Sequence, residues 1–221
     1  MSWEEPYRSS EEEEETVVKW FKHRILKAYN ETGFIGIIIY GLQGAGKSTL
    51  ALKIAKAVYG DWWTALNWVF FEWETLKAMF LRLNVNDRAK VIIWDDAGVY
   101  GSSYMFFYNK RIVDEMSRYM QLIRTRTSCL ILTAVSPTRI LRAVRDQPDW
   151  FRVKVRKRED ISIARIYMVD VSPLGELIAF RLSKDLPFIP RLPDDVYKVY
   201  VRERDRYIER IIPSVEASDM S

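Results

Sequence analysis

The chain has 221 residues, of which 48% are hydrophobic and 29% are charged, and its formal net charge is +4. This length and composition indicate a folded protein of one domain, because a typical domain has about 150 residues, and they exclude a disordered or fibrous chain. The single cysteine, Cys129, cannot form an internal disulfide, and together with the single histidine, His23, it is too few for a Cys/His zinc site.

The chain carries no sign of a membrane or export segment. Its longest apolar run, residues 34–40, is far shorter than the roughly 20 residues that a membrane-spanning helix needs. The N-terminus is acidic and has no apolar stretch followed by a small-residue cleavage site, which argues against a secretory signal. We therefore expect a cytoplasmic protein with no membrane partner.

Charge is distributed unevenly. Residues 1–15 carry seven acids and one base, so the remainder has 33 bases, 23 acids and a net charge of +10. Residues 110–165 hold much of the excess, with fourteen bases and six acids. Such a basic region favours a polyanion such as DNA as partner, and the alternative is a solvated, ion-paired surface. Abundant Arg, Lys and Glu beside only three glutamines are typical of thermophilic sources.

Helical and strand patterns alternate along the first two thirds of the chain. Helices are predicted from their apolar spacing, the first with a Ser10/Glu13 capping box, and strands from short, continuously apolar runs. The helices are expected at 10–30, 47–59, 74–83 and 110–125, with a short one ending near 146, and the strands at 34–40, 68–71, 91–94 and 129–135. This alternation predicts an α/β fold with a mainly parallel, doubly wound sheet between helical layers.

The last third has a different pattern. Strands at 150–156, 161–171 and 177–182, the last two joined by a turn at 172–175, predict an antiparallel extension of the sheet edge. A helix at 195–212, closed by Pro213 and followed by a frayed tail, is expected to end the chain. We divide the chain into an acidic segment and helix (1–32), a core (33–158), and a β extension, helix and tail of the same domain (159–221).

A glycine-rich loop follows the first predicted strand. Its sequence, G-L-Q-G-A-G-K-S-T, satisfies the pattern G-x-x-x-x-G-K-[ST] between a buried strand and a helix. Glycines let the backbone approach a phosphate closely, a lysine places positive charge on the β- and γ-phosphates, and a hydroxyl can bind Mg²⁺. The predicted nucleotide-binding residues are Gly41, Gln43, Gly44, Ala45, Gly46, Lys47, Ser48 and Thr49, with Ser48 also a metal ligand.

Two acids follow the third predicted strand, V-I-I-W, in the same sheet. This pattern, together with the glycine-rich loop, resembles the Walker B and Walker A motifs of P-loop NTPases of the ASCE division, which includes AAA+, RecA-like and FtsK/HerA-like ATPases. The resemblance covers roughly residues 33–156 and implies a P-loop NTPase sandwich with ATP and Mg²⁺ as cofactors. It assigns Asp95 to the metal and Thr133, at the end of a strand expected between the two motif strands, to a polar sensor of the γ-phosphate.

The resemblance leaves the water-activating residue open. Most ASCE enzymes place a glutamate after the Walker B aspartate, whereas this chain has Asp96, and RecA-like members use the neighbouring strand, where Glu72 stands. We favour Asp96 over Glu72. Arg142 and Arg145 resemble the arginine fingers of AAA+ proteins, which act on a neighbour's nucleotide and imply a homo-oligomer.

Two features bear on which branch of the ASCE division the chain resembles. Asp95-Asp96-Ala97-Gly98 resembles the Walker B of the DnaC/IstB-like helicase loaders of AAA+. The strand-rich C-terminal region departs from the helical lid of AAA+ proteins and is more similar to RecA/FtsK/HerA-like enzymes, including small DNA-packaging or replication ATPases of viruses and plasmids.

The sequence therefore predicts an oligomeric ATPase that acts on DNA, in replication, helicase loading, packaging or translocation. The cations of residues 152–158 are candidates for phosphate contacts, and the aromatic segment 98–108 for base stacking or subunit contact. Two alternatives remain open: a nucleotide-gated adaptor that binds a protein partner with little turnover, and a small-molecule P-loop kinase.

Overall fold

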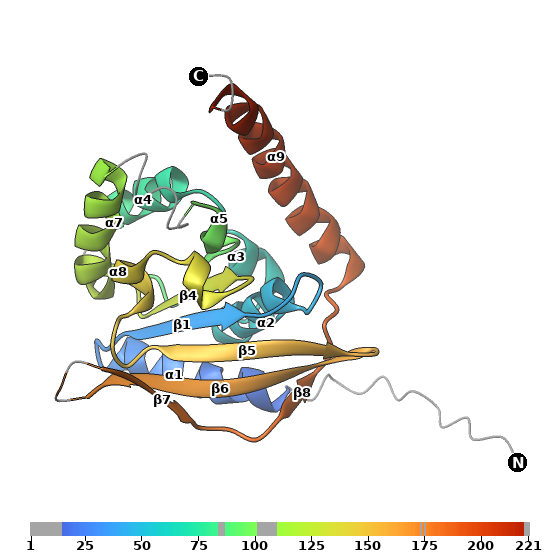
Figure 1. The fold of residues 1–221 in the computed structure, drawn as a ribbon. Helices are drawn as coiled ribbons and strands as arrows, with labels where there is room; N and C mark the ends of the chain where they lie inside the picture. The colour runs from blue at the N-terminus through green and yellow to red at the C-terminus, as the bar shows by residue number, and fades with distance from the viewer. Residues whose placement is uncertain (1–14, 84–86, 101–109, 173, 175, 219–221) are drawn as a thin grey trace, which may run out of the picture.

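A computed structural model describes residues 15–83, 87–100, 110–172, 174 and 176–218, and Figure 1 shows their arrangement. The described strands form one eight-stranded sheet in the order β2-β3-β4-β1-β5-β6-β7, with β8 also paired to β6. The strands β2, β3, β4, β1 and β5 pair in parallel, while β6, β7 and β8 pair antiparallel. The fold is therefore mixed α/β with a mostly parallel central sheet.

Five strands make up the parallel part of the sheet. Their bounds are β1 (Ile35–Tyr40), β2 (Val69–Phe70), β3 (Ile92–Trp94), β4 (Cys129–Ala134) and β5 (Phe151–Arg158). β1 and β4 are buried almost throughout, as continuously apolar strands covered on both faces should be. Cys129, at the start of β4, is completely buried.

Helices cover the first face of the sheet. Ile37, Ile39 and Ile131 point from alternate positions of β1 and β4 into a core shared with α1 (Thr16–Asn30) and α2 (Lys47–Tyr59). The short α3 (Trp62–Leu66) packs beside α2, and α9 (Asp194–Ser218) adds two buried tyrosines to this core.

The intervening residues face the opposite layer. Ile38, Ile92 and Leu132 pack against α4 (Trp73–Arg82), α7 (Lys110–Leu122) and α8 (Arg142–Arg145). A Cβ on Gly36 would lie 2.0 Å from the ring of Trp150, so only glycine leaves room for that indole on β1. Three short segments complete the layer and its connections: α5 (Ala97–Tyr100), η1 (Ile123–Thr125) and η2 (Pro137–Arg139).

The antiparallel extension has the predicted pairing and one additional strand. β6 (Ile161–Val171) pairs with β5 along its length, then with β7 (Leu177–Arg181) and β8 (Leu186–Phe188). The prediction missed β8 because a three-residue strand with a central proline has no alternating pattern. The domain boundary expected at 158/159 falls in the hairpin between β5 and β6.

The two ends of the chain require corrections. The first helix begins at Thr16, and Ser10 and Glu13, predicted to cap it, lie outside the described residues. Pro213 does not end the last helix, which continues to Ser218 and projects past α3 (Figure 1). Proline removes one helical N–H and strains the preceding turn, but the residues after it can still bond to carbonyls four positions back. In the described parts of the chain, no helix combines the length and apolarity needed to cross a bilayer.

Candidate functional site

The glycine-rich loop connects β1 to α2 at the carboxyl edge of the parallel strands. Gly44 and Gly46 have φ angles of 73° and 87°, in the left-handed region that glycine tolerates best. A Cβ on Gly46 would also lie 2.6 Å from Pro190, so the loop packs tightly against the segment after β8. Gln43 and Gly44 are exposed at the outer side of the loop.

The β5–β6 hairpin supports the loop from the other side. β1 pairs with β5 only as far as Tyr40 and Lys154, so the end of β5 continues beside the loop. The Ser162 hydroxyl, on β6, donates to the carbonyl oxygen of Ala45 at 2.9 Å. The loop backbone is therefore held in place by contacts that leave its exposed side accessible.

Lys47, the first residue of α2, is turned back toward the loop. The residue is 7% exposed, and Nζ donates to the carbonyl oxygen of Leu42 at 3.0 Å. Burial lowers the pKa of Lys47, and the negative charges of Asp96 and Asp95 oppose that shift. An ammonium has three N–H donors, so Lys47 can bind anionic oxygens in addition to this carbonyl.

Asp95 is the centre of a hydrogen-bond network. It is completely buried, and its Oδ1 accepts from the Ser48 hydroxyl at 2.9 Å although the two residues are 47 positions apart. The Thr133 hydroxyl also donates to Oδ1. The structure thus brings together three residues that the sequence singled out, Ser48, Asp95 and Thr133, from the ends of three adjacent elements.

Asp96 lies beside this network in an unusual backbone conformation. Its φ angle is 50°, and its N–H donates to the Thr133 hydroxyl oxygen at 2.9 Å. Burial and the charge of Asp95 raise the pKa of Asp96, whereas Lys47 and Arg204 lower it. A half-buried carboxylate with a raised pKa is a better proton acceptor than an ordinary aspartate.

The sequence did not identify Tyr200, although it completes the network. Tyr200 lies on α9, is buried, and donates its hydroxyl hydrogen to Oδ2 of Asp95. Burial and the charge of Asp95 raise the pKa of Tyr200, so it remains a protonated donor. The spacing of Val196, Tyr200 and Tyr207 along the helix signals a buried face, but not which part of the molecule that face contacts.

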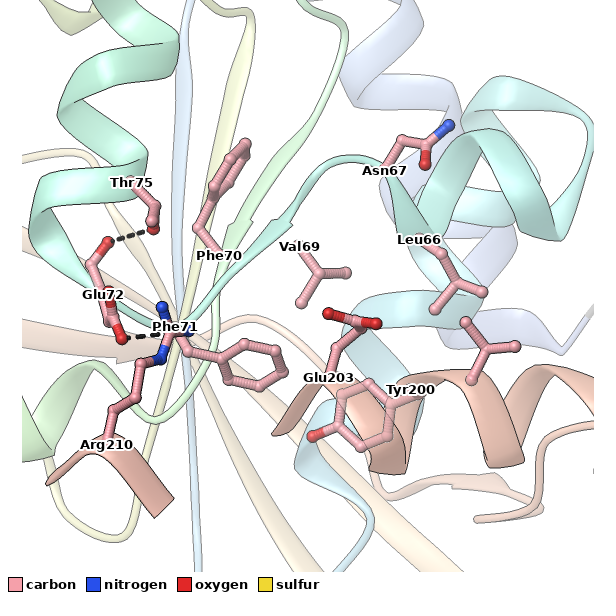
Figure 2. A pocket seen from close by; sticks show the side chains of 11 residues that line it. Leu66, Asn67, Val69, Phe70, Phe71, Glu72, Thr75, Tyr200, Glu203 and Arg210 are labelled. Atoms are coloured by element: carbon pink, nitrogen blue, oxygen red, sulfur yellow. Dashed lines mark hydrogen bonds and ion pairs between the residues drawn. The ribbon is translucent and has the colours of Figure 1, made fainter. Parts of the chain in front are cut away.

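Glu72 lies at the end of β2 and before α4, next to a cavity of about 360 Å³ (Figure 2). Its carboxylate forms an ion pair of 3.2 Å with Arg210 of α9 and is 17% exposed. Tyr200 and Glu203 from α9 also line this cavity, so it adjoins the Asp95 network. The remaining lining residues are Leu66, Asn67, Val69, Phe70, Phe71, Thr75 and Val199.

The two candidate arginine fingers bind the same aspartate. Arg145 donates from Nε and from a terminal amino group to the two Asp146 oxygens, at 2.6 and 3.1 Å. Arg142 bonds to Asp146 at 3.3 Å, but its side chain is 88% exposed. Both arginines therefore lie within one chain's ion-pair cluster, and their role toward a neighbouring chain stays a prediction.

The basic region has an exposed end. Arg156, Lys157 and Arg158 are exposed at the end of β5, which runs beside the glycine-rich loop. In the described part of the chain, four cations of the region pair with acids, Arg142, Arg145 and Arg152 with Asp146, and Arg165 with Asp185 at 2.6 Å. Most of the aromatic segment proposed for stacking, residues 101–109, lies outside the part of the chain that the structure describes.

Comparison with known proteins identified two viral relatives. Uncharacterized protein B-251 of Sulfolobus spindle-shape virus 1 is 31% identical over 219 residues, covering 89% of this chain and 84% of the relative. Uncharacterized protein ORF286 of Acidianus two-tailed virus is 31% identical over 185 residues, and the match covers 82% of this chain and 62% of that longer relative. No protein-family profile matches the chain.

Proposed function

The chain belongs to the family of viral proteins that includes B-251 of Sulfolobus spindle-shape virus 1, and we propose that it is a P-loop ATPase acting on DNA as an oligomer. The observation that carries the nucleotide site is the 2.9 Å hydrogen bond from Ser48 to Asp95, which joins the two motifs in one place. The order β2-β3-β4-β1-β5 supports the assignment, because β4, which ends near Thr133, lies between the two motif strands as in the ASCE division.

The residues present fit ATP with Mg²⁺. A Mg²⁺ ion is usually held by phosphate oxygens, water and one or two protein oxygens, which matches a site offering the Ser48 hydroxyl and the Asp95 carboxylate. Left-handed glycines at 44 and 46 expose loop backbone toward a phosphate. The bound ion supplies charge neutralisation for the transferring phosphoryl group.

Each residue then has a distinct task. Lys47 binds the β- and γ-phosphates, Ser48 is the metal ligand, and Asp95 orients the metal's shell from within its buried network. Thr133 bonds to Asp95 and to the backbone of Asp96, so it links the metal side of the site to the acid that we assign to water activation. The raised pKa of Asp96 supports that assignment.

The DNA-binding part of the proposal rests on charge. Exposed cations at the end of β5 lie on the same edge of the sheet as the glycine-rich loop, so a polyanion bound there would be close to the nucleotide. Contacts of this kind bind phosphates without reading sequence, and their strength falls as salt rises.

One observation favours a second candidate, a nucleotide-gated adaptor with little turnover. Glu72 is bound to Arg210, and Asp96 is one methylene shorter than the usual glutamate. Both candidate bases therefore differ from the free glutamate that most ASCE enzymes use to activate water. In that case the chain binds ATP and a protein partner but releases little phosphate.

The deciding experiment measures ATP binding and phosphate release with and without single- and double-stranded DNA, at low and moderate salt. We expect Lys47→Ala to abolish tight ATP binding, whereas Lys56→Ala, on the same helix but beside the Trp62 ring, should bind like the wild type. Asp95→Ala provides the blank for turnover.

The outcomes separate the two candidates. DNA-stimulated phosphate release supports the ATPase, and ATP binding without release supports the adaptor. Equal ATP affinity of Lys47→Ala and wild-type protein would refute the nucleotide site itself.

A further inference from the structure

The carboxylate of Asp95 is held from two sides. The Ser48 hydroxyl, on the helix after the loop, and the Thr133 hydroxyl, on β4 of the parallel sheet, both donate to Oδ1. Tyr200 donates to Oδ2 from the C-terminal helix, 105 residues away in the sequence. The two oxygens of one carboxylate thus connect the candidate metal site to α9.

The Tyr200 hydroxyl has little freedom to move. The residue is 5% exposed, its ring centroid lies 5.9 Å from that of Phe71, and the Arg204 guanidinium lies 5.8 Å from the ring centroid. A hydroxyl held in this way also holds the Asp95 carboxylate, because rotation of the carboxylate about its Cβ–Cγ bond would break the hydrogen bond to Oδ2. Oδ1 is thereby kept facing Ser48.

We propose that Tyr200 is a positioning residue for the Mg²⁺ side of the nucleotide site. Through the same Tyr200–Asp95 hydrogen bond, binding of Mg²⁺–nucleotide stabilises the packing of α9 against the site. This inference rests on the proposed function. Groups that orient a metal site from outside its ligand shell typically change metal affinity about 10–100-fold when they are removed. Energetic coupling is reciprocal. If the packing of α9 raises the affinity of the site for Mg²⁺, bound Mg²⁺ must stabilise the packing of α9 by the same free energy.

The test compares two tyrosine-to-phenylalanine variants of the same helix. Tyr200→Phe keeps the buried ring but removes the donor to Asp95, whereas Tyr207→Phe removes a hydroxyl from a ring that stacks on Phe71 at 5.4 Å. We would titrate Mg²⁺ into each variant with a fixed amount of fluorescent ATP analogue, and measure affinity for the same analogue in EDTA.

The expected result is a split between the two affinities. Tyr200→Phe should need about 10–100-fold more Mg²⁺ than wild type while its affinity in EDTA is unchanged, and Tyr207→Phe should match wild type in both. A merely structural role for Tyr200 would lower both affinities together. Equal Mg²⁺ requirements for the two variants would overturn the inference.

A second measurement needs no variant, which matters if Tyr200→Phe does not fold. Hydrogen exchange of wild-type α9 amides between residues 196 and 207 should slow when Mg²⁺ is added to the nucleotide-bound protein. Exchange that is the same with and without Mg²⁺ would contradict the coupling. Failure of the wild type to bind nucleotide at all would instead refute the proposed function, so the two failures are distinguishable.

Discussion

Glu72 and Arg210 form an ion pair of 3.2 Å between the start of α4 and the C-terminal helix. The pair engages the Glu72 carboxylate, one of the two acids that could activate water, with a guanidinium from another element. Among the described residues Asp96 forms no ion pair with α9, although Arg204 of that helix lowers its pKa, and it lies next to Thr133 and within the electrostatic reach of Lys47. The arrangement favours Asp96 as the base.

The first prediction ranks the two acids by turnover. Asp96→Asn should lower phosphate release by about 100-fold or more, the usual contribution of a general base, whereas Glu72→Gln should lower it less than about tenfold. Steady-state turnover with saturating ATP measures both variants, and ATP affinity serves as the control for site integrity. The reverse ranking would assign the base to Glu72 and make Arg210 its restraint.

The second prediction concerns stability and pH. The pKa of Asp96 is raised above its usual value of 3.8, so the stability that its protonation contributes is present at pH 3 and lost as pH rises through the folded-state pKa. Asp96→Asn should therefore raise the unfolding temperature relative to wild type more at pH 7 than at pH 3.

A matched control separates charge from backbone effects. Asp149 is exposed and also has a positive φ of 62°, so Asp149→Asn makes the same chemical change in a similar backbone conformation. Subtracting its effect at each pH from that of Asp96→Asn removes the contribution of the amide substitution itself. If no pH dependence then remains for Asp96→Asn, ionisation of Asp96 does not oppose folding.

Much of the fold could be predicted because several helices and strands have one clear pattern of apolar residues. β1 contains four buried isoleucines and is followed by a glycine, and the predicted bounds of α2 and β6 are those observed. β8 could not be found, since Leu186–Phe188 forms a strand only because β6 offers it an open edge. The continuation of α9 beyond Pro213 also could not be predicted, because local rules treat proline as a terminator.

The candidate site likewise has residues that the sequence predicts and residues that it does not. Ser48, Asp95 and Thr133 could be anticipated together because each lies at or after the carboxyl end of a parallel strand, and those ends meet at one edge. Tyr200 and Arg210 could not, because helical spacing identifies a buried face without naming its neighbour. Long-range packing of α9 on α3 and on Phe71, which follows β2, decides that neighbour.

The third prediction tests the arginine fingers. Arg145→Ala should lower turnover about 10³-fold or more with ATP affinity unchanged, the effect expected when a finger is lost. Arg142→Ala provides the exposed comparison on the same short helix. If only one of the two variants loses turnover, that residue is the finger.

Mixing inactive variants tests whether the finger acts between chains. Lys47→Ala retains Arg145 but lacks the lysine for phosphates, and Arg145→Ala has the opposite defect. Equal mixtures should recover part of the turnover when one chain completes its neighbour's site. Mixtures as inactive as their components would argue that Arg145 acts within its own ion-pair cluster with Asp146.

The fourth prediction concerns DNA. Replacing Arg156, Lys157 and Arg158 by serine should weaken binding to DNA of any sequence, and should reduce the slope of log affinity against log salt by about 2–3. Fluorescence anisotropy at several salt concentrations measures this slope. Neutralising Arg202 and Arg206, which are exposed on α9, is the control and should leave the slope nearly unchanged if DNA binds along β5.

The fifth prediction concerns the core beside β1. Gly36→Ala places a methyl group 2.0 Å from the Trp150 ring and should destabilise the fold by about 1–3 kcal/mol through overpacking. The double variant Gly36→Ala/Trp150→Leu should recover part of that loss, because leucine vacates the space next to residue 36. Additive losses in denaturant titrations would show that the two positions do not compete for the same volume.

The buried position of Cys129 has a practical consequence for experiments. Burial raises its thiol pKa well above the usual value, so the native chain presents little thiolate to alkylating reagents. Because the sequence has one cysteine, a second one introduced at an exposed position becomes a unique attachment point for a dye or spin label. Pairs of such labels can then report distances within the folded protein, without first replacing the buried cysteine at the start of β4.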